Sequence, residues 1–243
     1  MTTIVHISDL HTGYTQFRED LLQQTIDEIN EMKPSAVIIT GDLTDHGFYR
    51  EFVEAKKYID MIEPTKIIVP GNHDARNIGD EVFEDLFGER YGTLELKEEA
   101  IKIIGLDSSE PDLGHGKIGR LQKKFMEEEI ADAKERGLFI IIALHHHIIS
   151  IPNTGRERNI LSDAGDILLA LLKNDVNLVL SGHKHVPHLW KMKNTIFSTA
   201  GTVSSMKLRG NTCPSYNIIE IDNQYVEITQ HNSDGTEKEL TQP

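Results

Sequence analysis

Residues 4–11 read IVHISDLH, a short and mainly apolar run that leads directly into an aspartate and a histidine. The run at residues 4–7 is rich in branched side chains and too short for a buried helix, so it predicts a buried β-strand. Runs of the same kind lie at residues 36–40, 66–69, 101–106, 139–144 and 176–180. The chain is therefore expected to carry a series of buried strands.

Amphipathic segments separate these runs. Leu22, Ile26 and Ile29 line one helical face before Pro34 stops the pattern, and a second apolar face repeats from Phe48 to Ile62. Further helices are expected at residues 121–133 and 164–172. Continuous apolar strands that alternate with helices are typical of βαβ units, so this pattern predicts an α/β fold with a mainly parallel, doubly covered sheet.

The sequence changes character after Ser181. Short β segments are expected at residues 188–192, 195–199, 216–221 and 225–229, with a turn signal at residues 222–223 between the last two. No linker, low-complexity tract or internal repeat divides the chain. We therefore expect one domain over residues 1–243, with an α/β body and a β-rich C-terminal portion from about residue 186.

Composition limits the classes of partner. The 243 residues carry 25 Lys and Arg against 39 Asp and Glu, which gives a formal charge of −14. This charge repels nucleic acid and disfavours its binding, but does not exclude it, since metal ions or a local basic patch reverse the electrostatic field at a site. The single cysteine, Cys213, forbids an internal disulfide and fits a reducing compartment, so a cytoplasmic location is expected. No stretch approaches the ~18 to 20 apolar residues of a membrane span, which predicts a soluble protein without membrane contact.

Polar clusters follow five of the predicted strands. Parallel strands present their carboxyl ends at one edge of a sheet, where α/β proteins bind ligands. Carboxylate and amide oxygens with imidazole nitrogens, and no thiolate, suit Mn, Fe or Zn. Singly, each cluster has a plainer interpretation as a turn, a cap or a polar strand end, but their common placement favours a metal site. The cluster residues are Asp9, His11, Asp42, Asp45, Asn72, His73, His145, His146, His147, His183 and His185.

The order of these clusters resembles a known family. The five motifs of the calcineurin-like metallophosphoesterases are matched by Asp9-x-His11, Gly41-Asp42-x-x-Asp45, Gly71-Asn72-His73-Asp74, a histidine pair after a buried strand, and Gly182-His183-x-His185. The resemblance implies a four-layer α/β/β/α sandwich with two mixed β-sheets, and a binuclear centre of two divalent metal ions.

The resemblance also implies the ligands. One metal would be held by Asp9, His11 and His185, and the other by Asn72, His145 and His183. Asp42 would bridge the two. We prefer His145 to His146 because it directly follows the predicted strand, although the sequence leaves both open.

Two further residues have roles in the expected chemistry. Two cations roughly 3.5 to 4 Å apart stabilise a phosphoryl transition state and acidify a bridging water, and His73 is placed to protonate the leaving alkoxide. The resemblance implies that Asp45 holds His73. Alternatively, His73 only orients a ligand, and Asp45 caps the helix that begins near Phe48.

Departures from the family motifs limit which branch of the family, and so which class of substrate, is expected. His46 stands where protein Ser/Thr phosphatases carry Arg, and His73 is kept where UDP-diacylglucosamine hydrolases usually carry Arg. The strings at residues 8–11 and 41–45 look most like those of class III cyclic nucleotide and glycerophosphodiester phosphodiesterases. At the fourth motif, those enzymes usually carry His-His-Pro-Pro, whereas residues 145–148 of this chain read His-His-His-Ile. We therefore expect a phosphodiesterase for a small diester. A repair-exonuclease-like nuclease and a noncatalytic scaffold with this fold are the alternatives.

Several cationic residues carry no assigned role. Arg156 and Arg158, in the loop at residues 151–159, either grip a nonreacting phosphate or sugar edge or belong to a solvated surface. Arg76 and Arg209 have the same ambiguity. An apolar edge strand in the C-terminal segments either pairs with a second subunit, which gives a homo-oligomer, or is covered within the chain.

Overall fold

The apolar run that opens the chain forms strand β1 (Thr2–Ile7), at the middle of a sheet. The structure is a computed structural model and describes residues 1–155, 160–209 and 213–241. In this part of the chain, the first sheet has six strands in the order β12 (Glu237–Glu239), β11 (Tyr225–Asn232), β10 (Ser215–Asp222), β1, β2 (Ala36–Thr40) and β3 (Lys66–Val69).

A second sheet of six strands lies within the same described residues. Its order is β4 (Gly92–Leu96), β5 (Ile101–Gly105), β6 (Phe139–Ala143), β7 (Leu178–Ser181), β9 (Thr195–Thr199) and β8 (His188–Met192). Both sheets are mixed: β1, β2 and β3 are parallel, as are β5, β6, β7 and β9, and the outer strands pair antiparallel. The predicted pair of mixed sheets is confirmed.

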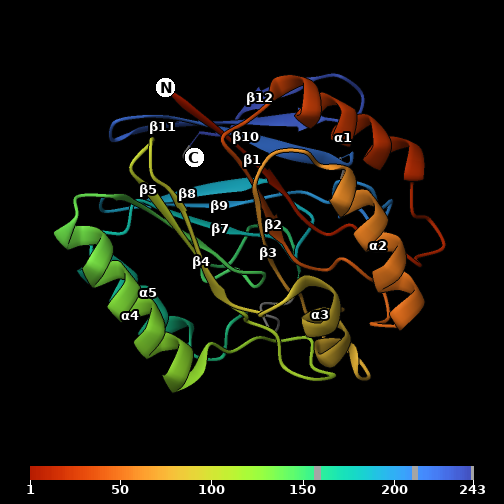
Figure 1. The fold of residues 1–243 in the computed structure, drawn as a ribbon, viewed down its shortest axis with the longest axis horizontal. Coiled ribbons are helices and arrows are strands. Elements are labelled where there is room, and N and C mark those ends of the chain that lie inside the picture. The colour runs from red at the N-terminus through yellow and green to blue at the C-terminus, as the bar shows by residue number, and fades with distance from the viewer. Residues whose placement is uncertain (156–159, 210–212, 242–243) are drawn as a thin grey trace.

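Helices cover the outer face of each sheet. Helices α1 (Glu19–Met32), α2 (Tyr49–Met61) and α3 (Gly79–Phe87) lie on one side of the molecule. Helices α4 (Gly119–Glu135) and α5 (Ala164–Lys173) lie on the other side, with the strands between (Figure 1). None of the helices in the described residues is both long enough and apolar enough to cross a bilayer.

Alternating side chains fix the order of the layers. In β1, Val5 and Ile7 belong to the apolar cluster under α1 and α2, whereas Ile4 belongs to a cluster between the two sheets. In β6, Ile140 and Ile142 face the helices and Ile141 faces the other sheet. This period of two gives every central strand two buried faces. The α/β/β/α sandwich follows.

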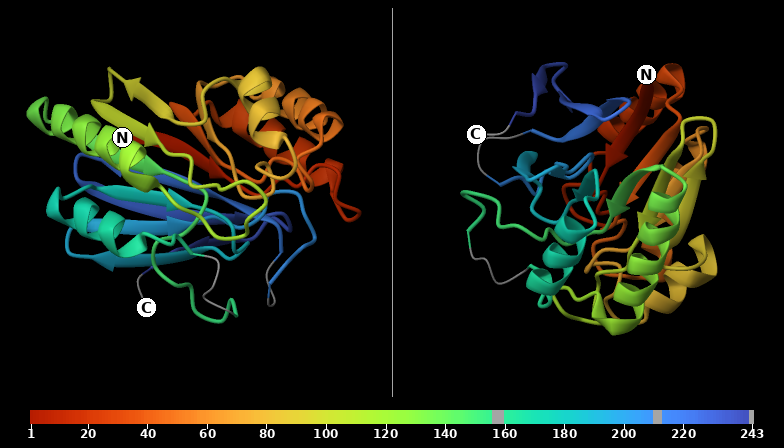
Figure 2. Two further views of the ribbon diagram at one scale, coloured as in Figure 1. Left: turned by 90° about the horizontal axis from the view of Figure 1, so that it is seen from below. Right: turned by 90° about the vertical axis from the view of Figure 1, so that its left-hand side faces the viewer.

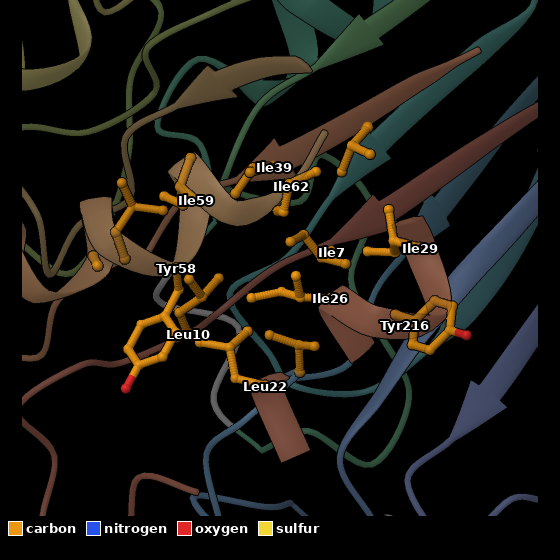
Figure 3. Packing of buried hydrophobic residues seen from close by; sticks show 14 of the residues in the cluster. Ile7, Leu10, Leu22, Ile26, Ile29, Ile39, Tyr58, Ile59, Ile62 and Tyr216 are labelled. Carbon is orange, nitrogen blue, oxygen red and sulfur yellow. The ribbon is translucent and has the colours of Figure 1, made fainter. Parts of the chain in front are cut away.

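The first apolar cluster shows this packing directly. Ile7 and Leu10 lie against Leu22 and Ile26 of α1, and Ile59 of α2 closes the cluster (Figure 3). These side chains are at most 2% exposed. The periodicity that predicted the two helical faces therefore describes the buried faces of α1 and α2.

The prediction of one mainly parallel sheet is wrong in one respect. The six apolar runs divide between the two sheets, with β1, β2 and β3 in one and β5, β6 and β7 in the other. A buried strand needs apolar cover on both faces, but its sequence does not say whether a helix or a second sheet supplies it. The C-terminal strands are likewise divided, with β8 and β9 in the second sheet and β10 and β11 in the first. Strand β10 pairs with β1, and Figure 2 shows blue C-terminal strands close to the red N-terminal strand.

Three short elements have no counterpart in the sequence predictions: α3, β4 and β12. Strand β12 reads EKE and is exposed along its length, so it carries no apolar period. Strand β4 is only partly buried. Helix α3 has nine residues, and its short apolar face of Val82, Phe83, Leu86 and Phe87 was not recognised in the sequence. The predicted helices and strands otherwise differ from the observed ones by a few residues at their ends.

Ile38→Ala tests the packing between the sheets. Ile38 is fully buried in β2 within the cluster between the two sheets, so truncation should lower the free energy of unfolding by about 2 to 5 kcal/mol. Urea unfolding followed by circular dichroism measures the change. Leu121→Ala on α4 is the matched control, because Leu121 is 86% exposed and should change stability by less than about 0.5 kcal/mol. Equal effects of both substitutions would contradict the layer assignment.

Candidate metal centre

The ligand candidates lie in loops that leave the carboxyl ends of the parallel strands. Five of them have a left-handed backbone, with φ of 57° at Asp9, 54° at His11, 51° at Asp42, 73° at His183 and 57° at His185. Aspartate and histidine adopt this region more readily than branched residues do, but at a cost that surrounding contacts must offset. The backbone thus turns sharply at each of these ligand candidates.

One group of side-chain atoms comes from β1 and β7. His185 Nε2 lies 3.1 Å from Asp9 Oδ1 and 3.1 Å from His11 Nε2, while His11 Nε2 lies 3.9 Å from Asp9 Oδ1. All three side chains are buried. These three atoms converge on one point, as ligands of one cation do.

A second group comes from β3, β6 and β7. Asn72 Oδ1 lies 2.8 Å from His183 Nδ1 and 3.2 Å from His145 Nε2. The two histidine nitrogens are themselves 3.2 Å apart. This group is also buried and also converges on one point.

Asp42 lies between the two groups. Its Oδ2 is 3.7 Å from His11 Nε2, and its Oδ1 is 3.4 Å from His145 Nε2. Each carboxylate oxygen thus faces a different group. The seven residues that the sequence proposed as ligands are all brought together, and the Asp42 carboxylate lies between the two groups.

The donor atoms fit divalent cations. His145 Nδ1 donates to the carbonyl of Thr40 at 2.7 Å, and His185 Nδ1 donates to the carbonyl of Lys207 at 2.5 Å, so Nε2 of both rings faces inward and is the atom that would bind a cation. Asp9 Oδ1 is buried without a hydrogen-bond partner. Lone pairs about 3 Å apart repel each other unless a positive charge lies between them. Two oxygen-and-nitrogen groups of this kind suit Mn, Fe or Zn.

The protonation of the site favours cation binding. Burial raises the pKa of Asp42, but the charges of His145 and His73 outweigh it and hold the pKa well below the usual range. For Asp9, His185 likewise outweighs burial and lowers the pKa to about 2. Burial lowers the pKa of His11 to about 4. His145 differs, because Asp42 outweighs burial and raises its pKa to about 9, so a proton competes with metal there.

Glycines allow the ligand loops to approach. A Cβ atom on Gly71 would collide with the carboxylate and main chain of Asp42, and one on Gly182 would collide with Ser8 and lie 2.5 Å from Asp9 Oδ2. Ser8 Oγ and the main-chain N–H of His183 both donate to Asp9 Oδ2, at 2.6 and 3.0 Å. These two hydrogen bonds fix Oδ2 of Asp9, and they direct Oδ1 to the ligand group.

His73 lies beside the bridging carboxylate. Its Nε2 is 4.0 Å from Asp42 Oδ2, and its Nδ1 donates to the main-chain carbonyl of Asp45 at 2.7 Å. The Asp45 carboxylate lies 3.2 Å from Nδ1 of both His73 and His11. Because a carbonyl only accepts, Nδ1 of His73 carries a hydrogen, and Nε2 is the nitrogen that faces Asp42.

The structure also decides between alternatives that the sequence left open. His146 Nδ1 pairs with Ser108 Oγ at 2.9 Å, and His146 belongs to neither ligand group, so the geometry favours His145. The helix-cap interpretation of Asp45 is wrong: α2 begins at Tyr49, and its N-cap is Phe48, without a side-chain hydrogen bond. Arg156 and Arg158 lie outside the described residues. Arg209 donates to the carbonyl of Thr154 at 3.4 Å.

Sequence reasoning missed several supporting residues. Asp74 accepts hydrogen bonds from the main-chain N–H groups of Leu43, Thr44 and Gly71 at 2.9 to 3.0 Å, which joins two ligand loops. Burial, with the charge of Asp42, raises its pKa to about 6. Lys207, on a segment without a distinctive pattern, reaches His73. The motif string contained Asp74, but no local feature pointed to Lys207.

Gly71→Ala should weaken metal binding, because the added methyl group displaces the Asp42 carboxylate. We expect a loss of about 10- to 100-fold in affinity, as for other changes next to a ligand. Titration calorimetry with Mn²⁺ measures it. Gly165→Ala in α5 is the control, since a Cβ there meets nothing within 4 Å. Unchanged affinity in Gly71→Ala would show that Asp42 is not held against that loop.

Comparison with known proteins agrees with this geometry. The family model described as calcineurin-like phosphoesterase matches residues 2–187. Over 202 residues, 75% of this chain, the sequence is 30% identical to a cAMP/cGMP dual specificity phosphodiesterase of Mycobacterium tuberculosis. Over 160 residues, 61% of this chain, it is 30% identical to a probable glycerophosphodiester phosphodiesterase of Arcobacter nitrofigilis. The matches span 61% and 58% of these relatives, less than two thirds of each.

A solved structure shares the fold. The chain superimposes on a dimetal phosphatase from Danio rerio with a TM-score of 0.78 and 11% sequence identity, covering 100% of this chain and 99% of the other. At this identity the likeness concerns the fold alone.

Proposed function

The chain belongs to the calcineurin-like phosphoesterase family, and from that premise we propose that it hydrolyses phosphodiester bonds of a small substrate, such as a cyclic nucleotide or a glycerophosphodiester. The observation that carries the proposal is the position of Asp42, whose two oxygens face two separate groups of buried ligands. Such an arrangement is typical of sites that hold two cations around one phosphoryl group.

Each group of residues would have a distinct task. Asp9, His11 and His185 would hold one cation, Asn72, His145 and His183 the other, and Asp42 both. When bound, two such cations neutralise phosphoryl charge and make a water molecule nucleophilic near neutral pH. His73 would donate a proton from Nε2 to the leaving oxygen. Asp45 would keep the His73 ring in place through its carbonyl group, 2.7 Å from Nδ1.

A small diester is favoured over nucleic acid. The two relatives are named for cyclic nucleotides and for glycerophosphodiesters. The chain carries a net charge of −14 with 6% aromatic residues. Nonspecific strand binding needs a basic groove with stacking side chains. The composition therefore gives no support to the nuclease alternative. The scaffold alternative is disfavoured because a noncatalytic protein does not need a complete set of metal ligands and a proton donor.

We also propose the domain organisation and the cellular location of the protein. One is a single domain over residues 1–243, which the apolar cluster shared by the two sheets supports. The other is a cytoplasmic location, supported by the single cysteine.

A substrate screen with metal-loaded protein tests the proposal. We expect turnover of cyclic nucleotides or glycerophosphodiesters to exceed turnover of single-stranded DNA. Preference for DNA would favour the nuclease. No turnover of any ester, with metal bound, would favour the scaffold.

Asp42→Asn should reduce metal content and turnover together, because the amide keeps the shape but removes the charge that both ligand groups share. Circular dichroism should show the fold retained. Metal analysis and diester hydrolysis on the same preparation check the result. Asp60→Asn on α2, where the Asp60 side chain is 59% exposed, is the control and should change neither. A fully active Asp42→Asn protein with two metals would contradict the bridging role.

His73→Ala separates proton donation from support of the metal site. With a poor alkoxide leaving group, the substitution should slow hydrolysis by about 10² to 10⁴. A p-nitrophenolate leaving group needs little protonation, so the loss on that substrate should be much smaller. Metal content should stay at the wild-type level. Equal losses on both substrates, with metal retained, would mean that His73 positions substrate or a ligand instead.

A further inference from the structure

Two cationic side chains converge on the proposed proton donor. Lys207 Nζ lies 3.2 Å from His73 Nε2, and Arg76 Nη2 lies 3.1 Å from the same atom. Lysine and arginine are donors only, and an imidazole nitrogen has a single lone pair. One nitrogen lone pair cannot accept hydrogen bonds from both cations, so at least one of these donors is available to another acceptor. If His73 is the acid, the leaving group and phosphoryl oxygens would lie beside His73 Nε2 and would offer that acceptor.

The main chain around Lys207 is fixed to the metal centre. Its carbonyl accepts the hydrogen of His185 Nδ1 at 2.5 Å, and its N–H donates to Ser205 Oγ at 3.1 Å. Upstream, Thr202 Oγ1 donates to the carbonyl of Asp9 at 2.6 Å. The segment that carries Lys207 is thus tied to two proposed ligands, which sets where the lysine side chain begins.

The Lys207 side chain is fixed less tightly than its main chain. It is 36% exposed, its Nζ lies 3.7 Å from Asp45 Oδ1, and it lies over the Tyr14 ring at 5.9 Å from the centroid. The 3.7 Å separation and the partial exposure of Lys207 make this a weak ion pair, so Asp45 can be exchanged for another anion at small cost. A lysine whose main chain is fixed and whose Nζ is only weakly paired is suited to bind a substrate anion.

We propose that Lys207, with Arg76 beside it, binds a nonbridging oxygen of the phosphoryl group in front of His73. The proposal rests on the function proposed above and adds a residue to it. On substrate binding, both cations would transfer their hydrogen bonds from His73 Nε2 to phosphoryl oxygens. Since the contact is electrostatic, it should favour a dianionic phosphate over a monoanionic diester.

The test uses inorganic phosphate as the probe with the Mn²⁺-loaded protein. Titration calorimetry should show phosphate bound about 10- to 100-fold more weakly by Lys207→Met, the range expected for one lost hydrogen bond to a charged group. Lys207→Arg should bind within about threefold of wild type, and Lys207→Gln should resemble Lys207→Met. On a diester substrate, Lys207→Met should raise KM more than it lowers kcat.

Lys124→Met is the matched control. It removes the same charge from α4, where the Lys124 side chain is 76% exposed, and it should leave phosphate binding unchanged. Equal weakening by Lys124→Met would reduce the effect to net charge and overturn the proposal. Wild-type phosphate affinity in both Lys207→Met and Lys207→Gln would also overturn the proposal. Loss of metal from both variants would overturn it as well, because the Lys207 side chain would then support the metal centre and not bind phosphate.

Failure of the proposed function and failure of the Lys207 role give different results. If metal-loaded wild-type protein neither binds phosphate nor hydrolyses any ester, the proposed function fails and the role of Lys207 falls with it. If the wild type binds phosphate and hydrolyses diesters but the Lys207 variants match it, only the role of Lys207 is overturned.

Discussion

The two oxygens of the Asp42 carboxylate face different ligand groups, and six other side chains must reach one of the two positions that this carboxylate defines. They come from loops after β1, β3, β6 and β7, which belong to two separate sheets. Five of the seven candidates have a left-handed backbone, at a cost on the order of 1 to 3 kcal/mol each. The rest of the structure has to offset that cost.

Packing and buried hydrogen bonds supply the compensation. The apolar cluster between the sheets holds the strand ends from both sheets at one edge. Gly71 lets one ligand loop approach Asp42, while Ser8, Thr202 and Asp74 fix neighbouring loops through buried hydrogen bonds. The precision of the site thus depends on residues that would bind neither metal nor substrate, which is expected where ligands must be held in one geometry.

Part of this could be predicted from the sequence because it is local. Buried strands such as β2 and the apolar face of α1 follow from residue periodicity, and Asp42 could be identified because it stands in an ordered motif next to Gly41. The division of the strands between two sheets was implied by the family resemblance alone and not by residue periodicity, since Ile38 would have the same sequence context against a helix. Lys207 was missed because it reaches His73 only through contacts between distant parts of the chain.

The proposed role of Asp42 is to bridge two cations, and anomalous X-ray diffraction from crystals of the Mn²⁺-loaded protein would locate them. Two anomalous peaks should lie roughly 3.5 to 4 Å apart, with one Asp42 oxygen bound to each. A single peak, or two peaks of which Asp42 touches only one, would contradict this role.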